Sequence, residues 1–281
     1  MSIKKLAIYI VAILVLAGCF VCYSILTKNQ RYKEVAFEIA YPSDTLFTVA
    51  DLEAYVEKNC PAVVGQLIDS VNLRDFEHNL EKYPYLESVD IITNQGVVIV
   101  KAKQEKVIAK VFSTGNNWFY LAKSGKLLPE APLPAGRVVV ANGKIPEPAR
   151  VSFKPSPTGI YVNAEAEKMD SLRNVKGVYS TLYTIWEIAD YLDKNKFWKA
   201  QIGQIYVDDS GDINLITTVG EQRVVFGKFR YCDKPSQEVK QRFDNLESVY
   251  KQGFNKITGW DRHKTINLKF GQEVSCEKKV E

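Results

Sequence analysis

Residues 6–26 form the longest apolar stretch of the chain, and no charged side chain interrupts it. As a helix rising about 1.5 Å per residue, the stretch would be roughly 31 Å long, enough to cross the hydrocarbon core of a bilayer. A helix is expected because each backbone N–H and C=O must find a partner inside the segment where water is absent. The pattern therefore predicts a transmembrane helix at 6–26, after a tail at 1–5 and before a polar stalk at 27–34.

The next stretch predicts a strand followed by two helices. Residues 35–39 alternate between apolar and polar positions, and a helix is expected from Thr48 to Asn59, where Pro61 prevents its continuation. A second helix is expected to start at Asn72. Its apolar stripe has spacings of three and four and consists of Leu73, Phe76, Leu80 and Tyr83.

Two strands are expected to close this first region. The runs 86–93 and 97–103 are rich in β-branched residues and flank the turn residues 94–96. The order strand, helix, helix, strand, strand predicts a three-stranded sheet covered on one face by two helices. The pattern does not predict how the strands pair.

The second region has an α+β pattern in which an antiparallel meander stands between helices. Prolines concentrate at 129–157 and exclude helix there. A run at 163–176 is polar and is expected to be loop. The expected elements are short strands at 137–141 and 160–162, a helix at 178–192, meander strands at 202–207, 213–218 and 222–226, a helix at 236–252 capped by Gly253, and a closing strand at 265–276.

Composition excludes several classes of protein. The chain has 281 residues, 46% of them hydrophobic and 25% charged, which is typical of globular protein. Without the two lysines of the tail, 35 basic side chains stand against 33 acidic ones, which is too balanced to indicate nucleic-acid binding. The cysteines outside the apolar stretch, at 60, 232 and 276, are odd in number, and we interpret them as buried thiols rather than a disulfide framework.

No catalytic constellation is present in the sequence. The histidines, His78 and His263, both stand among charged residues and are expected to be solvated. Asp208-Asp209-Ser210-Gly211-Asp212 places three acids in five residues, but Ile213 stands where a calcium loop needs glycine, so we interpret the run as a hairpin turn. We expect neither an enzyme nor a bound cofactor or metal.

The residues Asn72–Ala109 resemble the POTRA domain of the FtsQ/DivIB cell-division family. They carry Leu80 and Pro84 at the end of the helix, then the hairpin, then the phrase Glu105-Lys106-Val107-Ile108-Ala109, which lacks the usual proline. The phrase Trp118–Gly125 is similar to another family segment, with Ala122 in place of an acidic residue. The resemblance implies a POTRA-like β-α-α-β-β domain at 35–111.

The remainder, 112–281, is similar to the β domain of the same family. The order of meander, helix and final strand carries the match, with Ile202–Leu215, Val225-Phe226-Gly227, and Gly259-Trp260 followed by Ile266–Phe270. The resemblance implies that an FtsB-like strand adds to the edge of the last strand, beside an FtsL-like partner. By motif position it assigns partner contacts to Lys269 and Phe270, and we extend them to Gly271, Gln272 and Glu273.

These expectations describe a single-pass division scaffold that links early division proteins to septal peptidoglycan synthesis. The opening Met-Ser-Ile-Lys-Lys resembles an export signal, so the N-terminus is expected in the cytoplasm and the bulk of the chain in the periplasm, at the septum. The POTRA-like domain would dock further division proteins. Two other functions stay open: a POTRA-containing transport component, and a membrane-tethered cell-wall hydrolase.

The apolar stretch also admits a lipoprotein interpretation. Leu16-Ala17-Gly18-Cys19 resembles a bacterial cleavage-and-lipidation box, in which Cys19 would become the acylated N-terminus. Residues 20–26 continue apolar, whereas a mature lipoprotein usually begins with a polar tether. We therefore favour the membrane helix and leave lipidation of Cys19 open.

Overall fold

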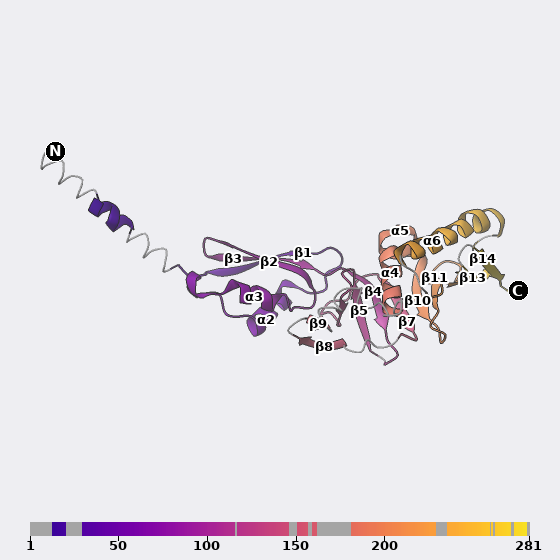
Figure 1. Cartoon of the computed structure of the whole chain (residues 1–281), viewed down its shortest axis with the longest axis horizontal. Helices are drawn as coiled ribbons and strands as arrows, with labels where there is room; N and C mark the ends of the chain where they lie inside the picture. Colours follow the sequence, from indigo (N-terminus) through magenta and orange to yellow (C-terminus); the bar gives the residue numbers. More distant parts are fainter. Residues whose placement is uncertain are drawn as a thin grey trace. The chain divides into compact units, whose positions relative to one another are not determined.

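Figure 1 shows the computed structural model of the chain, which describes residues 13–20, 30–115, 117–145, 151–156, 159–161, 181–228, 235–258, 260, 262–270 and 273–279. The chain divides into two compact units. Unit 1 comprises residues 1–40, 49–81 and 88–103, and unit 2 comprises 41–48, 82–87 and 104–281. The expected domains, 35–111 and 112–281, stay a prediction, and the loop expected at 163–176 lies outside the described residues.

Unit 1 is built from a three-stranded sheet with two helices on one face (Figure 1). The strands follow one another across the sheet in the order β1-β3-β2, and β1 runs parallel to β3. The predicted order of strand, helix, helix, strand, strand is confirmed. The elements are β1 (Glu34–Ala40), α2 (Val49–Asn59), η1 (Ile68–Ser70), α3 (Leu73–Leu80), β2 (Leu86–Asn94) and β3 (Val97–Gln104).

Local chemistry sets the ends of these elements. Asn72 caps α3, since its side chain accepts a hydrogen bond from the backbone N–H of Arg74 at 3.1 Å. Between β2 and β3, Gln95 and Gly96 have φ angles of 49° and 84°, the consecutive positive values that a tight hairpin turn requires. The prediction that Tyr83 belongs to the α3 stripe is wrong, because α3 ends at Leu80 ahead of Pro84.

Unit 2 has an α+β fold around a nine-stranded mixed sheet, in the order β14-β13-β12-β11-β10-β7-β4-β5-β6. The predicted antiparallel meander is confirmed, since β11 pairs antiparallel with both β10 and β12. The strands are β4 (Val107–Phe112), β5 (Trp118–Ala122), β6 (Leu127–Leu128), β7 (Val139–Gly143), β10 (Ile202–Val207), β11 (Ile213–Thr217), β12 (Arg223–Val225), β13 (His263–Phe270) and β14 (Glu273–Lys278), beside a separate pair β8 (Val151–Ser156) and β9 (Gly159–Tyr161).

The helices of unit 2 pack on the sheet through one hydrophobic core. They are α4 (Thr181–Lys194), α5 (Lys196–Gln201) and α6 (Pro235–Ser248), which continues as the wider π-helical segment η3 (Val249–Thr258). The prediction that Gly253 caps the last helix is wrong, because Gly253 lies inside η3. Apart from its chain neighbours and the backbone of its own helix, no atom lies within 4 Å of the position that a Cβ would take there, so no close contact requires glycine at this position.

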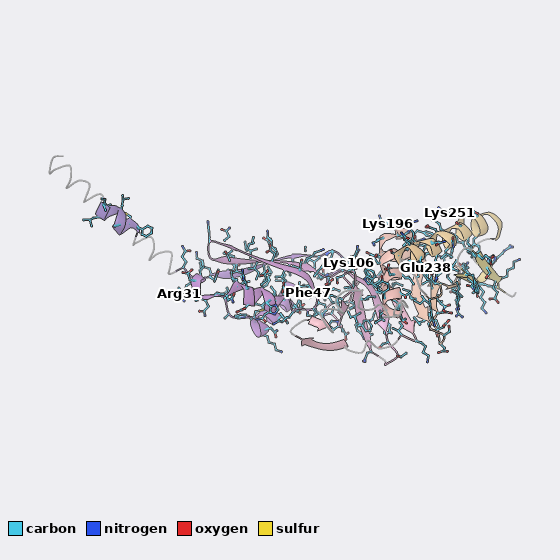
Figure 2. The ribbon with its side chains drawn as sticks, in the orientation of Figure 1. Arg31, Phe47, Lys106, Lys196, Glu238 and Lys251 are labelled. Carbon is cyan, nitrogen blue, oxygen red and sulfur yellow. The ribbon has the colours of Figure 1, made fainter. Side chains whose placement is uncertain are left out.

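Two short segments, 41–48 and 82–87, belong to unit 2 although they lie within the first region of the sequence. Phe47, labelled in Figure 2, is fully buried and meets Tyr83 edge to face, with ring centroids 5.1 Å apart. The Tyr85 hydroxyl donates to the carbonyl oxygen of Glu130 at 2.6 Å, and burial, assisted by the nearby Glu130 carboxylate, raises the pKa of Tyr85 to about 12. Tyr85 therefore stays a protonated donor at neutral pH.

The predicted membrane helix is covered by the structure only in part. Residues 13–20 are helical, and their large side chains are exposed, from 59% for Val15 to 71% for Phe20. Within the described residues, no helix has both the length and the apolar character needed to span a bilayer. The span at 6–26 stays a prediction.

Phe243 of α6 lies at the centre of the unit 2 core. Its side chain is fully buried and stacks on Tyr191 with centroids 4.4 Å apart, while Trp198 and Phe226 each lie at 5.4 Å. These rings come from α4, α5, α6 and the residue just after β12, so Phe243 joins the helical layer to the sheet.

We expect Phe243→Ala to lower the free energy of unfolding of unit 2 by about 3–5 kcal/mol, because it removes buried surface and leaves a cavity. Urea unfolding followed by tryptophan fluorescence measures the loss. Val219→Ala, at a position 53% exposed, is the matched control and should change the value by less than about 0.5 kcal/mol. Equal stability of the two variants would contradict a central role for Phe243.

Candidate partner-binding site

The two ends of the nine-stranded sheet differ in what they offer to a partner. At one end, β6 has two residues, Leu127 and Leu128, and both are buried. At the other end, β14 has six residues, and all except the half-buried Val274 are exposed. An edge strand carries backbone N–H and C=O groups that its own sheet does not pair. Of the two ends, β14 is therefore the one that another strand can reach.

The closing strand expected at 265–276 is two strands. β13 pairs with β12 on one side and with β14 on the other, so β13 is not the edge. The sequence contains the reason, because Gly271 and Gln272 interrupt the β-branched pattern and glycine in a strand pattern favours a bulge or reversal. The sequence-based prediction missed that Val274–Lys278 form a separate edge strand. Gly271, which favours a chain reversal, was the residue that could have indicated it.

Two of the predicted partner-binding residues, Phe270 and Glu273, fall at the turn end of the β13–β14 hairpin. Phe270 is the last residue of β13 and is paired in register with Glu273, the first residue of β14. The Phe270 side chain is 68% exposed, and Glu273 is exposed too. Gly271 and Gln272 lie outside the described residues. The structure thus brings Phe270 and Glu273 together beside the edge, and their role in binding stays a prediction.

Lys269 is held by an internal ion pair. Its ammonium group contacts the carboxylate of Asp212, whose side chain is 9% exposed, against 41% for Lys269. The lysine stem lies over Gly227, where φ is +80° and an added Cβ would be 3.1 Å from Lys269 Cγ. Lys269 is therefore engaged in an ion pair within unit 2. A Lys269→Glu substitution would place a second carboxylate beside that of Asp212.

The acidic run after β10 is a hairpin turn, as predicted. Asp208 Oδ1 accepts hydrogen bonds from the Ser210 hydroxyl at 2.6 Å and from the backbone N–H groups of Ser210 and Asp212, each at 3.0 Å. Asp208 Oδ2 accepts from Asn214 at 3.1 Å. Burial alone would raise the pKa of Asp208, but these hydrogen bonds outweigh it and lower that pKa overall. The turn that holds Asp212 against Lys269 is thus fixed by an ionised carboxylate.

The two histidines differ in their exposure to solvent. His78 is solvated as predicted, with its side chain 66% exposed and Glu81 at 3.7 Å. The same prediction is wrong for His263, which is 7% exposed and stacks on Phe254 at 4.8 Å, because it begins β13 on the core side.

Cys276 is exposed on β14, so the buried-thiol prediction is wrong there. Cys60 is half-buried, and Cys232 lies outside the described residues.

The described parts of the chain contain no group of three or more His, Cys, Asp or Glu side chains that could hold a metal ion. What the β13–β14 end of the sheet offers is backbone pairing, an exposed aromatic ring and a set of surface charges. Strand addition of an extended polypeptide uses a surface of this kind.

Comparison with known proteins places most of unit 2 in one family. A family model described as FtsQ/DivIB, C-terminal related, matches residues 106–277, which is more than half of the chain. The match begins just before β4 and ends within β14, so it includes the whole nine-stranded sheet except the last residue of β14. No curated protein matches the chain.

We expect Asp208→Asn to lower the free energy of unfolding by about 1–2 kcal/mol at pH 7, since it weakens hydrogen bonds to a charged acceptor. The pKa of Asp208 is lower in the folded chain, so its contribution is fully present above the unfolded pKa, near 3.8, and is lost as pH falls through the folded value. The difference between variant and parent should therefore shrink as the pH of urea unfolding falls from 7 to 2. Asp209→Asn, with a side chain 89% exposed, is the control and should change little. A difference that is constant across this pH range would contradict the assignment.

Proposed function

The chain belongs to the FtsQ/DivIB, C-terminal related family, and we propose that within its role in cell division it is a bitopic scaffold that recruits FtsB- and FtsL-like partners. FtsQ/DivIB proteins are non-enzymatic division scaffolds. The scaffold would link early division proteins to septal peptidoglycan synthesis. In this proposal the helix at 6–26 anchors the chain in the inner membrane, with the N-terminus in the cytoplasm and both units in the periplasm at the septum.

The single observation that carries this proposal is the exposed edge strand β14. An FtsB-like segment would pair with the outward backbone groups of Glu273–Lys278 and extend the nine-stranded sheet by one strand. Backbone pairing supplies affinity that depends little on sequence, whereas flanking side chains supply specificity.

Phe270 is the side chain we assign to specificity at this edge. A phenyl ring that is 68% exposed would be covered when a partner strand lies along the hairpin, and aromatic residues often dominate the energy of protein interfaces. Glu273 would face charge on the partner. Lys269 contributes through the pair with Asp212, which fixes the end of β13 near the turn of β10 and β11.

Unit 1 would be a second docking surface in this proposal, as a POTRA-like domain with the strand, helix, helix, strand, strand order. The family match starts at Lys106 and does not include unit 1, so its role rests on its own surface.

We expect Phe270→Ala to weaken co-purification of the FtsB-like partner with the full-length chain by about tenfold, the usual scale for losing an interface aromatic. Tyr206→Ala, an aromatic residue 37% exposed on β10, is the matched control and should leave co-purification unchanged. Unaltered thermal unfolding of both variants would show that the loss is one of binding. Phe270 has no place in the interface if its variant binds like the parent.

The strand-addition geometry has its own readout. On binding of the FtsB-like partner, the outward amides of Glu273–Lys278 should exchange hydrogen more slowly, because they gain hydrogen-bond acceptors. Mass spectrometry of peptides covering β14 measures this. Binding without added protection in β14 would overturn strand addition, even if Phe270 were needed.

The division role is tested in the cells that carry this chain. We expect depletion to give filaments without septa, and a fluorescent fusion to accumulate at midcell. Normal septa after depletion would contradict the scaffold role. Loss of outer-membrane proteins in normally dividing cells would favour a transport component, and cell-wall hydrolysis by the detergent-solubilised chain would favour a hydrolase.

A further inference from the structure

Unit 1 contains an apolar groove that no part of the proposed β14 site uses. It encloses about 530 Å³ and lies between β1 and α2. Phe76, which is buried, and Val64, which is 56% exposed, both line it. The apolar residues that line it are Val35, Phe37, Val56, Pro61, Ala62, Val63, Val64 and Phe76.

The groove runs along a strand whose outer backbone is open. β1 is the end strand of its sheet and pairs only with β3, from Glu34 to Ala40. Just before β1, the N–H of Lys33 donates to Gly96 at 2.8 Å on the β3 side, whereas Tyr32 pairs away from β3, with Gln66 at 3.0 Å and Gly65 at 2.8 Å.

Backbone direction alternates along a strand, so the residues two, four and six places after Tyr32 also point away from β3. The N–H and C=O groups of Glu34, Ala36 and Glu38 therefore face outward. Among the described residues, none hydrogen-bonds to these groups on that side. This is a row of donors and acceptors at the spacing that a partner strand requires.

The chain itself already begins such a pairing. Arg31 forms an antiparallel bridge with Leu67, and Ile68 donates to the carbonyl oxygen of Gln30 at 3.0 Å. The Arg31 guanidinium, labelled in Figure 2, secures this loop by donating to the carbonyl oxygen of Gly65 at 2.6 Å. A partner strand running antiparallel to β1 would continue the line of 65–68 along Glu34–Glu38.

Charge selects the kind of strand that fits. Glu34, Glu53 and Glu57 line the groove against one cation, Lys33, and Glu38 follows farther along β1. These four carboxylates are exposed, and none has an ion-pair partner among the described residues. A second copy of β1 would bring Glu34 and Glu38 against the same acidic groups, which disfavours self-pairing.

We propose that this groove binds an extended segment of a partner protein in which apolar side chains alternate with lysine or arginine, added antiparallel to β1. The apolar side chains would fill the groove over Val35, Phe37 and Val56, and the basic ones, which alternate to the opposite face of the added strand, would lie beside Glu34 and Glu38. This inference rests on the proposed docking role of unit 1 and is independent of the β14 edge.

The test uses two labelled peptides with the full-length chain in detergent, one of alternating lysine and valine and the other of alternating glutamate and valine. We expect the basic peptide to bind at least about tenfold more tightly by fluorescence anisotropy at low salt. The Glu34→Lys/Glu38→Lys variant should reverse the preference, whereas Asp90→Lys, on the opposite edge strand β2, should keep it. On binding, hydrogen exchange should slow at Glu34, Ala36 and Glu38.

Three results would overturn the proposal. They are equal binding of both peptides, an unchanged preference in the charge-reversed variant, and binding without protection of β1. Dimerisation of the chain through β1 in the absence of peptide, seen by sedimentation, would make a second copy the occupant instead. Phe270→Ala should bind the basic peptide like the parent, so failure here is distinguishable from failure of the β14 site.

Discussion

The constraint on which this structure depends is that a backbone hydrogen bond left open at the end of a sheet must be covered, solvated or given to a partner. Both units contain open sheets, so each has two ends. In unit 2, the end at β6 is short and buried, while β14 is long and exposed. In unit 1, β1 keeps an open side along Glu34–Glu38. We infer that the binding capacity of the chain follows from these two strands.

Exposed edge strands promote aggregation, and charged side chains oppose it at both β1 and β14. On β14 the charges are mixed, with Glu273 and Glu277 close to Lys278, whereas β1 carries Glu34 and Glu38 alone. Self-pairing of β1 is thus disfavoured by repulsion. The same charges would make each edge selective for a partner strand of complementary charge.

The β14 edge is useful only if the sheet behind it is rigid, and α6 supplies that support. Arg242 donates to the backbone carbonyl oxygens of Phe226 and Lys228, just past the end of β12, and pairs with Glu238, labelled in Figure 2. Because β12 has three residues, β13 gains little from ladder pairing on that side. The helix therefore fixes the strand that carries the hairpin, and Phe243 holds the helix on the core.

The features of the fold that depend on interactions between neighbouring residues were predicted correctly from the sequence. Asn72 and Gly96 act within a few residues of themselves, and the helix start and the hairpin turn they indicate are present. Strand pairing joins residues far apart, and no short pattern contains it. The contact between Lys269 and Asp212 spans 57 positions, so a residue predicted to meet a partner is engaged within its own sheet. The burial of His263 was missed for the same reason, since its charged sequence neighbours do not report the Phe254 ring stacked on it.

The two edges differ enough that one partner strand would not suit both. A segment rich in lysine would be attracted to the acidic groove beside β1, but at β14 it would meet Lys278 and gain less. A segment that covers Phe270 needs an apolar or aromatic face at the hairpin end, which the groove over Phe37 does not require. Since a specific interface must disfavour the wrong partner as well as bind the right one, the differing charges of β1 and β14 would let a single chain hold the two proposed partners without exchanging them.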